Sequence, residues 1–473
     1  MDSVAKVTAE GPTVVRRRKP GESRVLSIGQ QRLWYLSQLT PNNSAYNVPY
    51  ASRLHGPIHA EHLQKALNGV VERHEVLRTV VLAPGGTPVP VLLKKWSVEL
   101  KQVDLRQLPA EQRPPEAQRL LSGESAKPFN LSRDLMLRAV LIRLSEDEHI
   151  FLHIAPHMAF EGGSVSVFYR DLAQFYEASQ LGQTPSLPDM TLQYCDYALW
   201  QRNYLQGEKL ETLTRYWKET LTGAPTMSLP LDYPRPAIHT MRGKRHFMVM
   251  PKDLIRQANQ FFRESGTTPY RGLCAAFNVF LHAYSGALDI SIGSPFGPRC
   301  SGIEDLIGFF VNTVVLRTDL SGKPTFREMM KRVDQVVRGA IEHSDLTFDK
   351  LVEAARPTRD SSRSPLFQVN FRAPREPYPA LQIKGLTSEA ANYVDNGTSK
   401  FDLALEIETS RGEACYFEYC VDLFKEETIV RMVAEFHNLL RDLIAHPDVS
   451  IDRVPQVRAI MQRISERNTP LRN

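Results

Sequence analysis

Apolar residues recur at the spacing of an amphipathic helix in three stretches of the chain. The first stretch is carried by Leu63, Ala66, Leu67, Val70 and Val71. The same period returns in residues 326–337, directly after the capping-box pair Thr325 and Glu328, and again in residues 429–443. The pattern therefore predicts a helix at each of these places.

Continuous apolar runs bounded by turn residues predict strands elsewhere. Residues 77–82 and 89–93 flank a Gly-Gly pair at 85–86, which is typical of a hairpin. Residues 135–144 and 149–154 are separated by a short acidic turn and indicate two buried strands. Because helices and strands occur in both halves of the chain, the sequence predicts α+β or α/β lobes.

Composition narrows the class of protein. The 473 residues suggest two to four domains or two large lobes, and 42% hydrophobic with 23% charged residues allows a sizeable core. The formal charge of +5 is too balanced to predict binding to nucleic acid, and no apolar run approaches the roughly 20 residues that span a bilayer. We therefore expect no nucleic-acid or membrane partner. The five cysteines are odd in number and scattered, so we expect reduced thiols in a cytoplasmic protein.

Two segments differ from the rest in composition. Residues 1–25 mix small, polar and basic side chains and predict a flexible basic tail. The basic cluster could dock on an acidic partner, although a solvated terminus is the favoured interpretation. The proline-rich residues 229–236 indicate a long surface connection.

One segment combines residues suited to chemistry. His157 follows the predicted strand 149–154, Glu161 comes four residues later, and Gly162 and Gly163 precede Ser164, the predicted N-cap of the next helix. Histidine has an ordinary pKa of about 6.5, which suits proton transfer near neutral pH. On spacing alone, a histidine bonded to the backbone at a strand end is the favoured interpretation, because an isolated His-x3-Glu is a weak signal.

Other familiar sites receive less support. His149, His153 and His157 would share one face of a strand, but neighbours in this series lie about 13 Å apart, too far to share one metal ion. The chain has no GxSxG, no GxxxxGK[ST] and no GxGxxG after a strand. Serine hydrolases, P-loop proteins and dinucleotide-binding proteins are therefore disfavoured.

Five segments in order resemble the condensation domains of nonribosomal peptide synthetases, from about Leu26 to about Arg463. They match the family's opening helix, its second motif, its inter-lobe region and its fifth and sixth motifs. These segments are residues 27–34, 73–79, 216–217 with 229–236, 292–295 with 307–313, and 343–345 through 364–369.

The family's central motif, HHxxxDG, is altered here. Its second histidine, which is catalytic in the family, corresponds to His157, and its glycine is kept as Gly162. Pro156 replaces the first histidine and Glu161 replaces the aspartate. The resemblance implies a structural pair between Glu161 and Arg299.

Two further residues lie in tunnel-side motifs of the family. Asn312 and Gln368 are weaker candidates for the substrate tunnel, and ordinary packing or loop roles are the favoured interpretation for both.

The resemblance also implies an architecture. We expect two lobes like chloramphenicol acetyltransferase, residues 26–195 and 196–455, arranged as a V-shaped pseudo-dimer with a central tunnel. Residues 456–473 would form a linker-like tail. The protein would be a monomer that works with acyl or peptidyl carrier proteins as donor and acceptor. Those carriers would supply phosphopantetheine arms, with no cofactor bound permanently.

The implied reaction is acyl transfer from a carrier-bound thioester to an acceptor amine or hydroxyl, forming an amide or ester. The acceptor could be carrier-bound or a small molecule, and His157 would take or orient its proton. Pro156 and Glu161 motivate an alternative, a non-catalytic module that binds carrier-bound substrate and recruits a modifying enzyme. A third interpretation is an acyltransferase that uses a CoA thioester.

Overall fold

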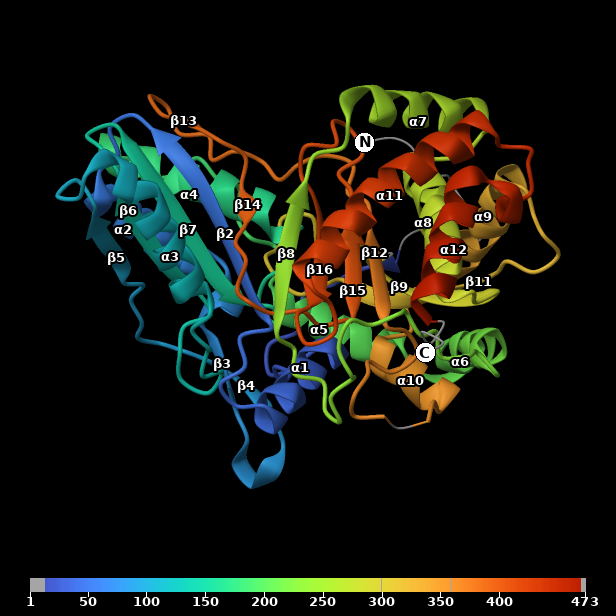
Figure 1. The fold of residues 1–473 in the computed structure, drawn as a ribbon. Helices are drawn as coiled ribbons and strands as arrows, with labels where there is room; N and C mark the ends of the chain where they lie inside the picture. The colour runs from blue at the N-terminus through green and yellow to red at the C-terminus, as the bar shows by residue number, and fades with distance from the viewer. Residues whose placement is uncertain (1–12, 299, 359, 469–473) are drawn as a thin grey trace. The chain divides into compact units, whose positions relative to one another are not determined.

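The apolar runs of the sequence pair into two six-stranded mixed sheets, one in each of two units (Figure 1). The computed structural model describes residues 13–298, 300–358 and 360–468. The first unit comprises the described residues up to Leu210, together with Gly297–Val311 and Tyr378–Val394. The second comprises Glu211–Phe296, Asn312–Pro377 and the described residues from Asp395 onward.

The first unit carries a sheet of order β13-β2-β7-β6-β5, in which β14 also pairs with β2. Its elements are β1 (Thr13–Val14), α1 (Ile28–Leu39), β2 (Asn47–His55), α2 (Ala60–Arg73), β3 (Thr79–Leu82), β4 (Val89–Leu92), β5 (Leu100–Asp104), α3 (Arg113–Ser125), β6 (Arg138–Arg143), β7 (Glu148–Pro156), α4 (Ser164–Leu181), α5 (Tyr194–Tyr204), β10 (Cys300–Ser301), β13 (Thr387–Ser388) and β14 (Asn392–Tyr393).

The alternating side chains of β7 explain why this strand is central. Phe151 and Ala155 pack into the core that includes the buried faces of α2 and α4. Ile150, Leu152 and Ile154 pack on the opposite face of the sheet, in a smaller core with residues of α3. A strand covered on both faces reads as a continuous apolar run, as the sequence does here.

The second unit carries a sheet of order β11-β9-β12-β15-β16-β8. Its elements are β8 (Gly243–Met248), α7 (Lys252–Glu264), α8 (Pro269–Ser285), β9 (Asp289–Phe296), β11 (Asn312–Asp319), α9 (Phe326–Glu342), α10 (Phe348–Ala355), β12 (Val369–Arg372), β15 (Leu403–Glu406), β16 (Cys415–Cys420), α11 (Glu426–Ala445) and α12 (Pro455–Asn468), while α6 (Gly207–Leu221) begins in the first unit and continues in the second. Aromatic contacts of Phe277 and Phe280 on α8 with Phe371, Phe417 and Phe436 join this sheet to its helices.

Most local predictions are confirmed. The three expected helices are α2, α9 and α11, the hairpin is β3–β4, and the two buried strands are β6 and β7. Thr325 and Glu328 form the predicted capping box. Ser164 differs from its prediction: it is the first residue of α4, and Gly163 occupies the cap position.

Both ends of the described chain differ from the expected tails. In the segment predicted to be a flexible tail, β1 pairs with β10 and Val15 is 3% exposed, whereas residues 1–12 lie outside the described residues. In the predicted linker, α12 buries Val457 and Ile460 completely. The few apolar residues of these polar segments pack against residues that are distant in sequence. The composition of a segment does not indicate such contacts, so the described parts of both tails were predicted wrongly.

The unit boundaries also differ from contiguous lobes. The expected boundary after residue 195 falls inside α5, and the first unit includes two later segments that supply β10, β13 and β14. These three strands have two residues each, too few for a periodic pattern. The V-shaped arrangement with a central tunnel stays a prediction. No helix among the described residues is both long and apolar enough to cross a membrane.

Candidate active site

Strand β7 places His157 just beyond the end of the first sheet. Its pairing with β6 already ends at Ile154, and its last residue, Pro156, lies opposite Asn47 of β2. A proline is tolerated there because no ladder bond to β6 is lost at a strand end. The backbone N–H of His157 instead donates to the carbonyl of Tyr46 at 2.7 Å.

One hydrogen bond determines which ring nitrogen of His157 is basic. Nδ1 lies 3.0 Å from the carbonyl oxygen of Phe160. A carbonyl oxygen only accepts, so in the neutral ring Nδ1 carries the proton and Nε2 keeps the lone pair. The ring of Phe309 packs edge-on against the imidazole with centroids 4.8 Å apart. The backbone bond that a structural histidine would make is therefore present, and it also orients Nε2 as a base.

Glu161 connects the histidine loop to a distant segment of the first unit. Its Oε2 accepts hydrogen bonds from the backbone N–H groups of Phe310, at 3.0 Å, and Val311, at 2.7 Å. Desolvation raises the pKa of Glu161 to about 7, against the lowering effect of the two amide bonds. Arg299, the expected partner, lies outside the described residues, so that pair stays a prediction.

Gly162 and Ser164 hold the loop on either side of this contact. A Cβ at residue 162 would lie 2.7 Å from the hydroxyl oxygen of Tyr378, so any larger residue would have to displace that side chain. The hydroxyl of Ser164 lies 3.2 Å from both the N–H and the carbonyl of Gly308. Glu161, Gly162 and Ser164 thus fasten the loop of His157 to the returning segments of the first unit.

Helix α1 contributes a contact and a cavity wall that the sequence analysis did not assign. Gln30 donates from Nε2 to the carbonyl of Met158 at 2.9 Å, while its Oε1 accepts from the N–H of Ser27 as part of a capping box. A small cavity of about 40 Å³ beside His157 is lined by Leu33, Leu36, Ser37, Thr40, Asn43, Tyr46, Asn47, Phe129, Leu131, Pro156, His157 and Met158. The spacing of Leu33, Leu36 and Thr40 along one helical face is the feature of the sequence that could have predicted this cavity wall.

The two weaker candidates belong to the second unit. Asn312 donates to the carbonyls of Ser344, at 2.8 Å, and Leu346, at 2.6 Å, and its Oδ1 accepts from the N–H of Phe348. Gln368 is 5% exposed, and its Nε2 donates to the carbonyl of Ser364 at 3.3 Å. Both side chains hold loops, and the structure brings His157, Glu161 and Gly162 together independently of them.

The other histidines of β7 have structural surroundings. His153 is completely buried with its ring centroid 4.5 Å from that of Phe168, and desolvation lowers its pKa to about 3. Desolvation also lowers the pKa of the buried His149. Within the described ranges, no group of three histidine, cysteine, aspartate or glutamate residues could hold a metal ion.

Known proteins are similar to this chain in sequence and in fold. Residues 22–460 match the family model of the condensation domain. A linear gramicidin synthase of Brevibacillus parabrevis is 41% identical over 438 residues, which cover 91% of this chain and 6% of that protein. The chain thus spans a small part of the synthetase that it matches.

Two solved structures show the same fold. The X-domain in a complex of the X-domain and OxyB from teicoplanin biosynthesis is similar with a TM-score of 0.81 and 26% identity, covering 95% of this chain and 99% of that one. The first condensation domain of the calcium-dependent antibiotic synthetase, with a substrate analogue, has a TM-score of 0.79 at 20% identity, covering 92% of this chain and 100% of that one.

The class follows from the fold and the strand-end histidine together. The two helix-flanked mixed sheets and the matching solved structures confirm the predicted α+β class and its fold of the chloramphenicol acetyltransferase type. The chain belongs to the condensation domain family. The predicted resemblance is therefore confirmed, and with it the acyltransferase class of the family. Condensation domains of nonribosomal peptide synthetases work with carrier protein domains.

Proposed function

We propose that this domain transfers an acyl or peptidyl group from a carrier-bound thioester to an acceptor amine or hydroxyl. Family membership supports the reaction class. The observation that carries the proposal is the hydrogen bond from Nδ1 of His157 to the carbonyl of Phe160, because it prepares Nε2 to accept a proton.

The chemistry assigned to His157 is proton transfer. Nε2 takes the proton of the acceptor as its nitrogen or oxygen attacks the thioester carbonyl. The new C–N or C–O bond replaces the C–S bond, and the proton passes on to the departing thiolate. General-base catalysis of this kind contributes about 10²–10⁴-fold, and holding both tethered substrates in one site contributes through proximity.

Glu161 and Gly162 are positioning residues in this proposal. They hold the loop of His157 against residues 308–311 and Tyr378. A pair between Glu161 and Arg299 remains part of the proposal, as does a place for Asn312 and Gln368 along a substrate tunnel.

The remaining partners follow from the reaction. Carrier proteins would present the donor and, where the acceptor is tethered, the acceptor on phosphopantetheine arms, and no other cofactor is proposed. All five cysteines are free, which supports a reducing cytoplasm as the location of the proposed monomer.

The experiment compares two acyl donors, and it compares the wild-type domain with the variant His157→Ala. The domain is given the same acyl group on a carrier protein or on CoA, with an amine acceptor, and amide product is measured by mass spectrometry. We expect product with the carrier donor, and its loss in His157→Ala. The matched control is His55→Ala, at the far end of β2, which should keep the activity. Equal or faster use of CoA by the wild-type domain would favour a CoA-dependent acyltransferase.

A second candidate function is a non-catalytic recruiting module. The similarity to an X-domain solved in complex with OxyB favours it, as do the replacements at Pro156 and Glu161. Binding of a loaded carrier without turnover of any donor and acceptor pair would support this module over the enzyme.

A further inference from the structure

A groove on the second unit gathers basic side chains. It has a volume of about 1060 Å³, slightly above the usual size range of ligand sites, and it lies beside β8, β16, the start of α11 and the end of α12. Three acidic residues line it, Asp232, Glu426 and Glu427, against six basic ones, Arg242, Lys244, Lys425, Arg431, Arg463 and Arg467. The lining therefore has an excess of positive charge.

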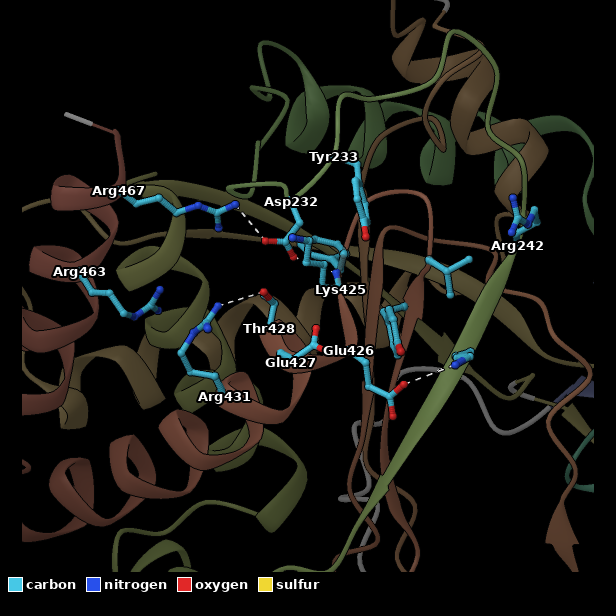
Figure 2. A pocket seen from close by; sticks show the side chains of 14 residues that line it. Asp232, Tyr233, Arg242, Lys425, Glu426, Glu427, Thr428, Arg431, Arg463 and Arg467 are labelled. Carbon is cyan, nitrogen blue, oxygen red and sulfur yellow. Dashed lines mark hydrogen bonds and ion pairs between the residues drawn. The ribbon is translucent and has the colours of Figure 1, made fainter. Parts of the chain in front are cut away.

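Part of this charge is neutralised inside the second unit. Four of the six basic residues form ion pairs: Arg242 with Asp422 at 3.1 Å, Lys244 with Glu426 at 3.4 Å, Arg463 with Glu435 at 3.0 Å and Arg467 with Asp232 at 2.9 Å. In Figure 2 the guanidinium group of Arg467 reaches Asp232 and that of Arg431 reaches Thr428.

Two cations have no carboxylate partner within the described ranges. Arg431 donates from Nη2 to the hydroxyl of Thr428 at 3.0 Å, and its buried Nε has no hydrogen-bond acceptor. The ammonium group of Lys425 lies 5.8 Å from the ring centroid of Tyr233. Because this Nε has almost no accessible surface, an anion in the groove would contact the terminal nitrogens of Arg431 and the ammonium group of Lys425 instead.

The backbone adds to the positive potential at the same place. Lys425 is the N-cap of α11 and offers no side-chain acceptor to the first amides of the helix. The helix dipole favours an anion at such an end, and the carboxylate of Asp232 already lies there, accepting from the backbone N–H of Lys425 at 2.9 Å. Asp232, Glu426 and Glu427 oppose a further anion. Asp232 is paired with Arg467 and Glu426 with Lys244, so the opposing charge without an ion pair among the described residues is that of the exposed Glu427.

We propose that this groove binds a ligand with phosphate groups that carry at least two negative charges, with Arg431 as the central contact. Arginine presents several N–H donors to a phosphate group, and Lys425 adds a point charge. Arg463 and Arg467 keep further N–H groups beside the carboxylates that they bind. A monocarboxylate would supply too few oxygens and too little charge for these donors. The residues that line the groove all belong to the second unit, whereas His157 belongs to the first.

The test is isothermal titration calorimetry of the whole chain with inorganic pyrophosphate, ATP and succinate. We expect pyrophosphate and ATP to bind, and succinate to bind at least about tenfold more weakly. Arg431→Gln should weaken pyrophosphate binding about tenfold or more, since it removes charge-assisted hydrogen bonds. The control is Arg338→Gln, an exposed arginine of α9 that pairs with Asp334, which should leave binding unchanged. Thermal unfolding establishes that both variants are folded.

Each outcome decides the proposal. If the chain binds ATP more tightly than pyrophosphate, the source of the phosphate groups is a nucleotide. If it binds both with equal affinity, the source is a free phosphate. No binding of either, equal binding of succinate, or an equal loss in Arg338→Gln and Arg431→Gln would overturn it. Because binding is measured directly, the result does not depend on whether His157 is catalytic.

Discussion

The Nδ1 atom of His157 lies 3.0 Å from the carbonyl oxygen of Phe160 within the loop between β7 and α4. The loop therefore orients its own base, since the acceptor comes from the same short segment. A carbonyl oxygen at this position keeps the proton of the neutral ring on Nδ1.

The first prediction concerns that proton. ¹⁵N NMR of histidine-labelled protein should show Nδ1 of His157 protonated and Nε2 unprotonated in the neutral ring, with His157→Ala used to assign the signals. A neutral His157 with its proton on Nε2 would contradict the orientation derived from Phe160.

The second prediction concerns Glu161 and pH. The pKa of Glu161 is raised by desolvation from 4.5 to about 7. Between these values the folded protein keeps a proton that the unfolded chain has released, so the free energy of unfolding falls as pH rises, by up to about 3 kcal/mol. The contribution is fully present below the lower value and lost above the higher one. Urea unfolding at about pH 5 and pH 8 should show this decrease in the wild type.

Glu161→Gln serves as the control for that measurement. Its amide oxygen can still accept from Phe310 and Val311, but it does not titrate. The difference in unfolding free energy between wild type and Glu161→Gln should therefore change across this pH window. The same pH dependence of the unfolding free energy in both proteins would show that Glu161 does not cause it.

The third prediction concerns the close approach at Gly162. Gly162→Ala should lower the free energy of unfolding by about 1–3 kcal/mol, because its Cβ would lie 2.7 Å from the hydroxyl oxygen of Tyr378. Tyr378→Phe removes that oxygen and should relieve part of the cost in the double variant. Gly123→Ala in α3 is the control, because its Cβ would meet open space. It should be neutral or stabilising by about 0.4–1 kcal/mol. Equal effects of the two alanines would refute the contact.

The fourth prediction separates the two roles of Gln30. Gln30→Glu keeps an acceptor for the N–H of Ser27, so the cap of α1 should persist, but it loses the donor to the carbonyl of Met158. We expect a loss of stability at least as large as in Gln30→Ala, because a buried carboxylate would face the carbonyl of Met158, together with slower acyl transfer because the loop of His157 loses a restraint. Wild-type turnover in both variants would show that this contact does not position the loop.

Local sequence patterns predicted the strand, the loop and the helix that surround His157. The buried run of β7, the glycines after Glu161 and the apolar stripe of α4 were enough to place His157 between a strand and a helix. The family motif then assigned its role, because periodicity carries no information about chemistry.

Contacts made by backbone groups were beyond prediction. The carboxylate of Glu161 accepts from the amides of Phe310 and Val311, which any residue types except proline could supply. The bond from Gln30 to the carbonyl of Met158 could not be predicted either, because its acceptor is also a backbone group. Short strands such as β13 and β14 gave no periodic signal for the return of residues 378–394 to the first unit.

The most direct measurement is the single-turnover rate constant for transfer from a loaded carrier protein to an amine. With His157→Ala the rate constant should fall by about 10²–10⁴-fold, while His55→Ala should match the wild type. A folded His157→Ala protein that transfers the acyl group as fast as the wild type would contradict the central claim that this imidazole moves the proton.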